Sequence, residues 1–384
     1  MSRIFVLGSG PLLEEQGTRF TSGQCLRTLH FARPLREAGH EVTLVTVPIE
    51  PPEAGKASAE LKARVTDERL RYKAFLTQDE EAIVARLRGT LRRHAHDAVV
   101  GVNAYPSYLL ARAEPDAPFW ADLNGWTMAE GATRAARVGH DGDMDHFWRL
   151  EVAALLAADR FSTASSRQAH ALFGELALVG RLGARTFDWP FVEAVPNAAY
   201  PLHAGLERDA QAAAEVVPPG EPVVLWSGGF NTWTDPALVV GALEVAMRAH
   251  PAAHFVATGG AVRGHDDTTF EKFRALAAAR LPQQRMHLLG WVETSLVAAL
   301  HARADVGINV DAPNVETLFG ARNRLTNMLA AGVPVATTEG TEIADWIARN
   351  HAGAVTPAGD AGALGEAIAG LLADPAGARR RAAR

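Results

Sequence analysis

The residues best suited to chemistry lie in one short stretch, residues 316–336, which reads ETLFGARNRLTNMLAAGVPVA. Arg322 and Arg324 fall where we expect a polar loop to lead into a helix, because apolar residues recur after them at helical spacing. The first turn of a helix has unpaired amide groups and the positive end of a dipole. Two guanidinium groups beside such a turn would suit a diphosphate, which they can bind through charged hydrogen bonds.

A glycine pair gives a second candidate for phosphate binding. Gly228 and Gly229 follow an apolar run at residues 223–226, and Phe230 completes the turn. Glycine has no β-carbon, so backbone amides in such a loop can approach a phosphate closely. Residues 231–234 contain no lysine or arginine, so the positive charge is expected to come from the two arginines named above.

Asp122 is the strongest candidate for a polar group at a second ligand site. It lies at the end of an expected strand, residues 118–123, and is followed closely by Asn124. A carboxylate at the carboxyl end of a parallel strand lies where α/β sheets bind their ligands. The alternative is a structural role, in which Asp122 caps the loop that follows.

The motif HDGDMDH, residues 140–146, has the composition of a metal site without the spacing. If it were a calcium loop beginning at Asp141, His146 would stand where glycine is required and Val152 where a bidentate glutamate is required. We expect an acidic loop that caps a helix beginning near Phe147, and no metal site.

Length and composition bound the class of protein. The chain has 384 residues, 48% of them hydrophobic, which is enough for one or two domains with extensive cores. It has 38 basic and 44 acidic residues, and this net charge of −6 argues against a broad nucleic-acid-binding surface. Cys25 is the only cysteine, which excludes an internal disulfide. No apolar run reaches the ~18 residues of a membrane span, so the expected location is the cytoplasm, and membrane-surface contact is not indicated.

The first half of the chain alternates between expected strands and helices, as in βαβ units. Strands are expected at residues 3–7, 41–47, 98–102, 118–123, 160–164 and 192–196. Residues 60–96 are charged, with leucines on one face, and predict a solvated pair of helices. Gly8–Pro11 is expected to form a loop. It is an incomplete dinucleotide fingerprint, because Leu13 occupies the third glycine position, and we favour a loop that lines a cleft.

The second half predicts another doubly wound sheet. Residues 201–221 include Pro-Pro-Gly and show no strand pattern, which is typical of a linker. Beyond it, each expected strand ends in a glycine or polar loop before a helix. These strands are expected at residues 223–226, 254–258, 286–289 and 305–310. The expected domains are therefore residues 1–200 and 222–384.

The stretch 316–336, with its AAGVPV ending, resembles the nucleotide-sugar site in the C-terminal domain of GT-B glycosyltransferases, especially those of glycosyltransferase family 4. The similarity extends to SGQCLR at residues 22–27, GHEV at 39–42 and VPNA at 195–198, which resemble turns of the N-terminal domain of that fold. The resemblance implies an α/β GT-B architecture, with two Rossmann-like doubly wound domains facing each other across a cleft.

The resemblance also implies roles for individual residues. Trp291 and Val292 lie where the family's loop brackets the base, and Asn327 takes the position of the carboxylate that binds ribose in many relatives. An amide can still bond two hydroxyl groups. Glu316 would contact the donor sugar, although the family's Glu-x7-Glu motif is broken here because Arg324 stands eight residues after it.

Three groups of site residues are predicted in this way. The catalytic group is Asp122, Glu316 and Arg324. The donor-binding group is Gly228, Gly229, Phe230, Trp291, Val292, Arg322, Asn323, Leu325, Thr326 and Asn327. The acceptor-side group is Gly10, Gly23, Arg27 and Asn124. The structural alternatives are surface charges for Arg27 and Arg324, and a loop carboxylate paired with Arg322 for Glu316.

The expected activity is transfer of a sugar from a nucleotide-diphosphate donor, with a UDP-sugar favoured, to a small-molecule or glycan acceptor. No cofactor, metal or nucleic-acid partner is expected, and a retaining outcome follows from the resemblance alone. The alternatives are a nucleotide-sugar epimerase on the same fold and a non-catalytic protein that binds sugar nucleotides. Family members usually close with a helix that crosses back to the first domain, and none is expected after the helix at residues 361–373.

Overall fold

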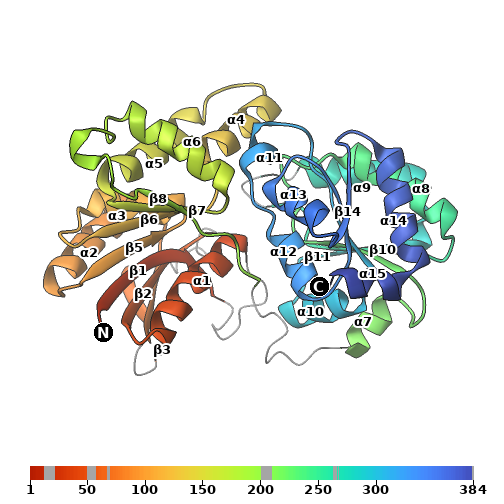
Figure 1. Cartoon of the computed structure of the whole chain (residues 1–384). Helices are drawn as coiled ribbons and strands as arrows, with labels where there is room; N and C mark the ends of the chain where they lie inside the picture. Colours follow the sequence, from red (N-terminus) through yellow and green to blue (C-terminus); the bar gives the residue numbers. More distant parts are fainter. Residues whose placement is uncertain are drawn as a thin grey trace. The chain divides into compact units, whose positions relative to one another are not determined.

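The computed structural model describes residues 1–12, 22–49, 58–66, 70–199, 210–262, 266 and 268–382. The chain divides into an N-terminal unit, Met1–Asn197, and a C-terminal unit, Ala198–Arg384. Each unit has its own sheet and its own hydrophobic core. Both are α/β structures built on mainly parallel strands (Figure 1).

The N-terminal unit is built on one eight-stranded sheet. Its strands are β1 (Arg3–Gly10), β2 (Glu41–Pro48), β3 (Ser58–Thr66), β4 (Leu70–Leu76), β5 (Ala98–Val102), β6 (Phe119–Leu123), β7 (Arg160–Thr163) and β8 (Val192–Ala194). They lie in the order β3-β4-β2-β1-β5-β6-β7-β8, and every pair except β3 with β4 is parallel. The helices are α1 (Gly23–Glu37), α2 (Glu80–Arg93), α3 (Ala104–Ala113), α4 (Thr127–Val138), α5 (Met144–Ala157) and α6 (Ser166–Leu178).

The glycines at the start of the chain belong to a strand. Strand β1 continues to Gly10, so the prediction of a glycine loop at residues 8–11 is wrong there. A β-carbon on Gly8 would lie 2.4 Å from side-chain atoms of Thr28 in α1, and one on Gly10 would lie 2.7 Å from Thr46 Oγ1 in β2. These glycines therefore let neighbouring elements pack closely. Leu13, the third fingerprint position, lies outside the described residues.

The predicted pair of helices at residues 60–96 is wrong in its first half. Strands β3 and β4 occupy that part, and only α2 is helical, beginning after Asp79, whose side chain accepts the Ala82 amide at 3.1 Å. In β4 the side chains of Leu70, Tyr72 and Ala74 are buried, which is the alternation of a strand. The many Lys, Arg and Glu residues nearby made the segment look helical.

The C-terminal unit has a six-stranded parallel sheet. Its strands are β9 (Val223–Ser227), β10 (His254–Thr258), β11 (Met286–Gly290), β12 (Val306–Asn309), β13 (Val335–Thr338) and β14 (Gly353–Thr356). Their order is β11-β10-β9-β12-β13-β14, which is third, second, first, fourth, fifth, sixth along the chain. In doubly wound sheets of this order, ligands bind beyond the carboxyl ends of the strands where the order reverses. Here that point lies between β9 and β12.

Helices cover both faces of this sheet (Figure 1). They are α7 (Ala210–Val216), α8 (Pro236–Ala249), α9 (Thr268–Arg280), α10 (Thr294–Arg303), α11 (Val315–Phe319), α12 (Asn323–Ala330), α13 (Glu342–Arg349), α14 (Ala361–Ala373) and α15 (Pro375–Ala382). Residues of α8, α9 and α14 form the core on one face, and residues of α7, α10, α12 and α13 form a second core cluster. Such double cover is typical of parallel sheets, whose strands are then buried throughout.

The four predicted strands and the helix at 361–373 in this half are confirmed. Helix α12 ends in the AAGVPV segment at a glycine, since Gly332 has a φ of 72° and the Val333 amide donates to the Met328 carbonyl at 2.9 Å. Helix α11 lies where a polar loop was predicted, and α13 and β14 were not predicted. Helix α15 follows residue 373, where no further helix was expected.

The predicted linker, residues 201–221, is described only in part. Residues 201–209 lie outside the described residues, and α7 occupies Ala210–Val216. Ala213 and Val217 are buried in the second core cluster of the C-terminal unit. This part of the segment therefore packs as a structural element.

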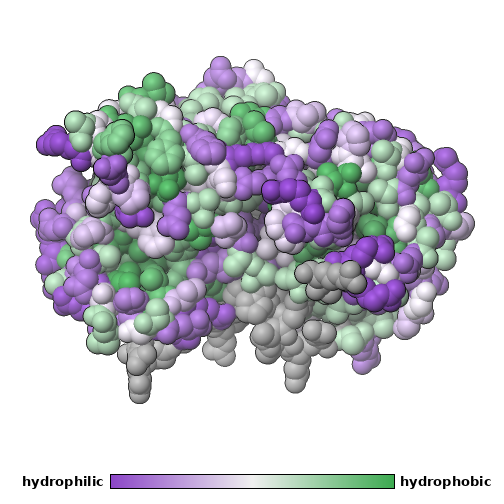
Figure 2. All heavy atoms as spheres, in the orientation of Figure 1, coloured by the Kyte–Doolittle hydropathy of each residue, from purple (hydrophilic) through white to green (hydrophobic). Residues whose placement is uncertain are grey.

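In the described part of the chain, no helix is both long and apolar enough to cross a membrane. Large apolar side chains that are exposed include Trp148, Leu156, Phe187 and Trp189 of the N-terminal unit. Figure 2 shows hydrophobic side chains in the region of α5 and α6, with hydrophilic ones between them. Residues 138–189 contain five arginines against seven acidic residues, so this region has no basic excess to attract anionic lipid.

Gly8→Ala tests the close packing of β1 against α1. The added methyl group would overlap Thr28, which is fully buried, so we expect the N-terminal unit to lose about 1–3 kcal/mol of stability. Gly174→Ala is the matched control, because Gly174 lies inside α6 with nothing within 4 Å of its β-carbon position. The control should gain about 0.5–1 kcal/mol in helix propensity. Urea unfolding of both variants measures the difference, and equal stabilities would contradict the packing argument.

Two acidic side chains are buried together between α5 and α6. Glu151 is 2% exposed, and Glu175 accepts a hydrogen bond from Trp126 Nε1 at 2.7 Å. Burial raises the pKa of Glu151 well above its ordinary value, and the Glu175 carboxylate raises it further. Burial also raises the pKa of Glu175. The pair therefore retains a proton at pH values where solvated glutamates have lost theirs.

This pair makes stability depend on pH. A carboxyl group with a raised folded-state pKa stabilises the fold fully below its unfolded pKa, and the contribution is lost as the pH rises through the folded pKa. Glu151→Gln should therefore stabilise the N-terminal unit at pH 8 relative to wild type and change little at pH 4. Urea unfolding at both pH values measures this effect. Glu114→Gln is the control, because the Glu114 side chain is 76% exposed. Parallel pH profiles for Glu151→Gln and wild type would refute the prediction.

Candidate functional site

Arg324 lies in the first turn of α12. Among the described residues, no carboxylate accepts a hydrogen bond from its guanidinium group. Its guanidinium lies 3.8 Å from the centre of the Trp226 ring and donates a hydrogen bond to the Gly229 carbonyl. Burial lowers the pKa of Arg324 to about 9, an effect partly offset by the nearby Asp311 carboxylate. The group remains charged at neutral pH. The alternative interpretation of Arg324 as a solvated surface charge is therefore wrong.

Arg322, two residues earlier, has its charge fully matched. It is 5% exposed, and its Nε donates to Asp311 Oδ2 at 3.0 Å. Its Nη1 and Nη2 donate to the two oxygens of Glu316 at 2.9 and 2.7 Å. Burial raises the pKa of Glu316, and Arg322 opposes that effect. The alternative in which Glu316 pairs with Arg322 thus describes the structure. Direct roles for Arg322 on a diphosphate and for Glu316 on a sugar stay predictions.

The predicted glycine loop lies at the carboxyl end of β9, and two of its amide groups are already hydrogen-bonded within the fold. Gly228 has a φ of 98°, which favours glycine, and its amide donates to the Thr258 carbonyl at 2.9 Å. The Phe230 amide is bonded to the next loop, and its ring is buried against Trp226 with ring centres 4.4 Å apart. The Gly228 amide is therefore already bonded within the fold, and phosphate binding by this loop stays a prediction. Gly229 has no amide partner among the described residues.

The other predicted donor residues occupy different environments. Trp291 is 44% exposed and its Nε1 donates to the Ala261 carbonyl at 2.9 Å, while Val292 is half-buried. Leu325 is fully buried in the core, so it positions α12. Asn323 and Thr326 are half-buried on that helix.

Asn327 fits its predicted role as an acceptor for hydroxyl groups. Its Oδ1 is buried and has no hydrogen-bond donor among the described residues. A buried oxygen without a donor costs free energy, and a ligand hydroxyl group would supply the missing bond. The role itself remains a prediction.

In the N-terminal unit, the structure brings two predicted site residues together in a buried ion pair. Arg27 Nε and Nη2 donate to the two oxygens of Asp122 at 2.9 and 2.7 Å, and the side chains are 1% and 0% exposed. Ser162 Oγ donates to Asp122 Oδ1 at 2.5 Å. Arg27 Nη1 also donates to the Pro196 carbonyl at 3.2 Å and to Asn197 Oδ1 at 3.3 Å.

These contacts change the interpretation of both residues. The alternative of a surface charge for Arg27 is wrong, and Asp122 does not cap the following loop. A carboxylate that is fully buried and held by a guanidinium is engaged in structure. The catalytic role of Asp122 and the acceptor-side role of Arg27 stay predictions that this burial does not support.

The remaining acceptor-side residues lie near the point where the strand order of this sheet reverses, at β1 and β5. Gly10 ends β1, Gly23 begins α1, and Asn124 follows β6. Asn124 Nδ2 donates to Asn103 Oδ1 at 3.5 Å, and Asn103 Nδ2 donates to the Gln24 carbonyl at 3.1 Å. Asn103, which the sequence analysis missed, has a φ of 77° directly after β5. A positive φ at an asparagine is a signal that a single sequence does not display.

The acidic motif at residues 140–146 is engaged by arginines. Asp143 Oδ2 accepts from Arg134 Nε at 2.8 Å, and Asp145 lies 3.1 Å from Arg149 Nε. Helix α5 begins at Met144, three residues before the predicted start. No group of three or more His, Cys, Asp or Glu side chains that could hold a metal ion occurs among the described residues.

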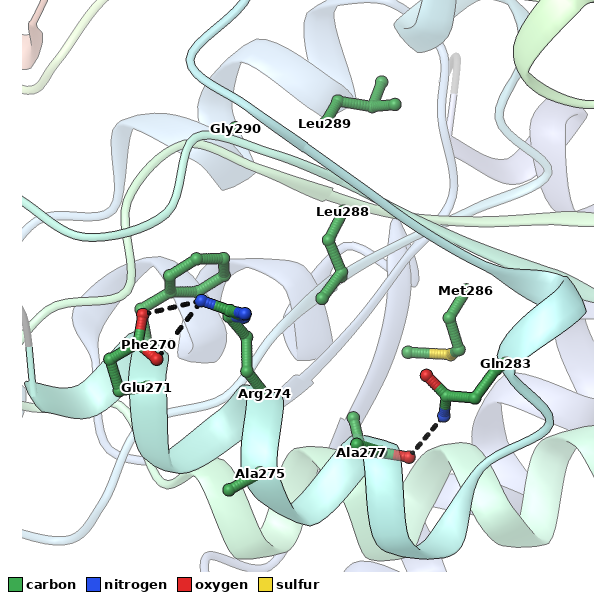
Figure 3. A pocket seen from close by; sticks show the side chains of 11 residues that line it. Phe270, Glu271, Arg274, Ala275, Ala277, Gln283, Met286, Leu288, Leu289 and Gly290 are labelled. Carbon is green, nitrogen blue, oxygen red and sulfur yellow. Dashed lines mark hydrogen bonds and ion pairs between the residues drawn. The ribbon is translucent and has the colours of Figure 1, made fainter.

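A groove of about 810 Å³ lies elsewhere on the C-terminal unit, between α9 and the edge strand β11 (Figure 3). Its charged lining residues, Glu271 and Arg274, pair with each other, and Gln283 donates to the Ala277 carbonyl at 2.9 Å. Apolar side chains such as Met286 and Leu288 complete the lining. The groove offers no unmatched charge to an anionic ligand, so the carboxyl ends of β9 and β12 remain the stronger candidate.

Comparison with known proteins gives a family match for the C-terminal unit. Residues 221–374 match the family model for glycosyl transferases group 1. They form a glycosyl transferases group 1 domain. This glycosyltransferase domain contains Arg324, its Trp226 platform and the Asp311–Arg322–Glu316 cluster. A sequence comparison with curated proteins gives no match.

Solved structures show that the whole chain has the GT-B fold. Sucrose-phosphate synthase from Thermosynechococcus elongatus superposes with a TM-score of 0.69 at 16% identity, over 100% of this chain and 94% of that one. HepE from Anabaena in complex with UDP-glucose gives 0.65 at 15% identity, over 100% and 93%. The E. coli trehalose-6-phosphate protein bound to UDP-2-fluoro glucose gives 0.68 at 13% identity, over 100% and 94%.

A pair of substitutions tests the structural role of Arg27 and Asp122. Asp122→Ala leaves a buried guanidinium uncompensated and should cost the N-terminal unit about 3–5 kcal/mol. The double variant Arg27→Met/Asp122→Leu removes both charges and should recover most of that loss. Urea unfolding of the three proteins measures it. If the double variant were no more stable than Asp122→Ala, the loss would have another cause than the unpaired charge.

Proposed function

We propose that this GT-B protein transfers a sugar from a nucleotide-diphosphate donor, with a UDP-sugar favoured, to a small-molecule or glycan acceptor. The observation that carries the proposal is the unmatched charge of Arg324 beside the Gly228–Phe230 loop, at the carboxyl end of β9. A diphosphate supplies the negative charge that the described surroundings of Arg324 lack, and the first turn of α12 adds the positive end of its dipole.

The chemistry follows from where charge develops. When the bond between the sugar and the diphosphate breaks, negative charge grows on the leaving phosphate oxygen. A guanidinium already fixed beside that position stabilises the charge without reorganising, which is the usual form of electrostatic catalysis. Arg324 is fixed by the Trp226 ring and the Gly229 carbonyl. In this scheme the guanidinium supplies the charge stabilisation that a divalent cation supplies elsewhere, and a retaining outcome rests on the family resemblance.

The structural neighbours support the choice of donor. HepE from Anabaena was solved with UDP-glucose, and the E. coli protein was solved with UDP-2-fluoro glucose. Trp291, exposed at the end of β11, offers an aromatic face for a base on the same side of the sheet as Gly229. These observations favour uridine, and the titration described next compares it with other bases.

Calorimetric titration of UDP, GDP and dTDP into wild type and Arg324→Ala tests the proposal. One nucleotide should bind at micromolar strength, and the variant should lose about 1.5–3 kcal/mol, the worth of a charged hydrogen bond. Arg274→Ala is the matched control, because Arg274 lies on α9 of the same unit and pairs only with Glu271 among the described residues. It should bind like wild type. Failure of all three nucleotides to bind would remove the main support for the function.

A further inference from the structure

Asp311 is a buried carboxylate with one oxygen that no described residue satisfies. It lies two residues after Asn309, the last residue of β12, and is 1% exposed. Its Oδ2 accepts two hydrogen bonds, from Asn309 Nδ2 at 2.7 Å and from Arg322 Nε at 3.0 Å. Its Oδ1 is buried and has no hydrogen-bond donor among the described residues. A buried oxygen without a donor costs free energy that a donor from a ligand would recover.

The backbone of Asp311 is fixed, so the unsatisfied oxygen is not the result of a loose loop. The Asp311 amide donates to Thr338 Oγ1 at 3.0 Å, on the neighbouring strand β13. Residue Thr234, in the loop after β9, forms an antiparallel bridge with Asp311. The carboxylate is thereby held at the junction of the β9 and β12 loops, which is the point where the strand order reverses.

The sheet order gives a direction to a ligand bound there. The strand β9, with Gly229 and the bound guanidinium of Arg324 at its end, lies between β10 on one side and β12 on the other. If the diphosphate lies at the end of β9, its two substituents extend to opposite sides. Trp291, after β11, is on the side of β10, which leaves the β12 side, with Asp311, for the other substituent.

We propose that Asp311 Oδ1 accepts a hydrogen bond from a hydroxyl group of the transferred sugar. This inference rests on the proposed function and adds a specificity-determining residue on the sugar side of the donor. The required ligand is one that can donate an O–H group, which a hexose joined to the diphosphate can do. Nucleoside diphosphate alone has no group to place there.

The sugar reaches this oxygen only after a neighbouring side chain turns aside, because the oxygen is covered by protein atoms. The Asp311 charge acts on Arg324, yet no described carboxylate hydrogen-bonds its guanidinium. Arg322 keeps the other carboxylate oxygen in place during such a movement.

The rival explanation is that Asp311 is only a counter-charge for Arg324. A counter-charge opposes the binding of every anion, and of UDP more than of a UDP-sugar because UDP carries more negative charge, so its removal would strengthen the binding of both. A hydroxyl acceptor contributes to binding of the nucleotide-sugar and has no effect on the nucleotide. Weaker binding of the nucleotide-sugar, with little change in the binding of UDP, therefore separates the two explanations.

Asp311→Asn is the decisive variant. The amide oxygen of the new side chain can still accept hydrogen bonds from Asn309 and Arg322. In that orientation its NH₂ group, a donor, takes the place of the acceptor Oδ1. We expect the dissociation constant of UDP to stay within about threefold of its wild-type value. For at least one of UDP-glucose, UDP-galactose and UDP-N-acetylglucosamine, affinity should fall about tenfold relative to that of UDP. Calorimetric titration of all four ligands measures these ratios, and a melting curve shows that the variant is folded.

Two further variants complete the experiment. Asp305→Asn makes the same change at the other end of β12, where the side chain accepts the Val223 amide at 2.9 Å, and should leave every ratio unchanged. If Asp311→Asn does not fold, Asp311→Glu keeps the charge and displaces the carboxylate, and the same loss for the sugar ligand is expected. If UDP binds and the ratios of a folded variant at Asp311 equal those of wild type, the inference is wrong and the proposed function stands. If UDP, GDP and dTDP all fail to bind to wild type, both fall.

Discussion

An arginine charge that its protein surroundings do not match is the interaction on which the proposed site depends. Arg27 and Arg322 are buried with bidentate carboxylate partners, whereas Arg324 rests on an aromatic face and a backbone carbonyl. A buried charge is costly unless it is paired. The fold can hold Arg324 in this state only because Trp226, the β9 loop and α12 are fixed by the core beneath them. Holding this charge without a carboxylate partner costs the fold free energy, and an anionic ligand would offset that cost.

Strand order determines which residues meet around this charge. The loops after β9 and β12 are far apart in the chain, yet they are adjacent because the order of strands reverses there. The bridge between Thr234 and Asp311 joins them directly. Arg322 then links the same place to α11 through Glu316. The tight glycine turn after β9 is thereby brought to a carboxylate and a guanidinium from a distant part of the chain.

Sequence reasoning predicted most strands of the C-terminal sheet and the helix that carries Arg324, but it did not predict the contacts among their side chains. The strand pattern, the glycine turn and the end of α12 at Gly332 follow from local rules of periodicity and capping, and these held. The pairing of Arg322 with Asp311 and of Arg27 with Asp122 depends on strands brought together by the fold, which no local rule supplies. The segment Leu70–Leu76 shows the same limit, since its alternation was masked by charged neighbours with helical propensity.

The Arg27–Asp122 pair illustrates why residue type alone misleads at the end of a strand. A carboxylate at the carboxyl end of β6 looks like a ligand group, but α1 places Arg27 directly against it. The remaining Arg27 nitrogen bonds to Pro196 and Asn197, the last residues of the N-terminal unit. The charge pair therefore fixes the place where the chain leaves this unit. In the C-terminal unit the equivalent edge holds Asp311, which differs in one respect, because one of its oxygens is left without a donor. That single unsatisfied oxygen distinguishes a carboxylate available to a ligand from one consumed by the fold.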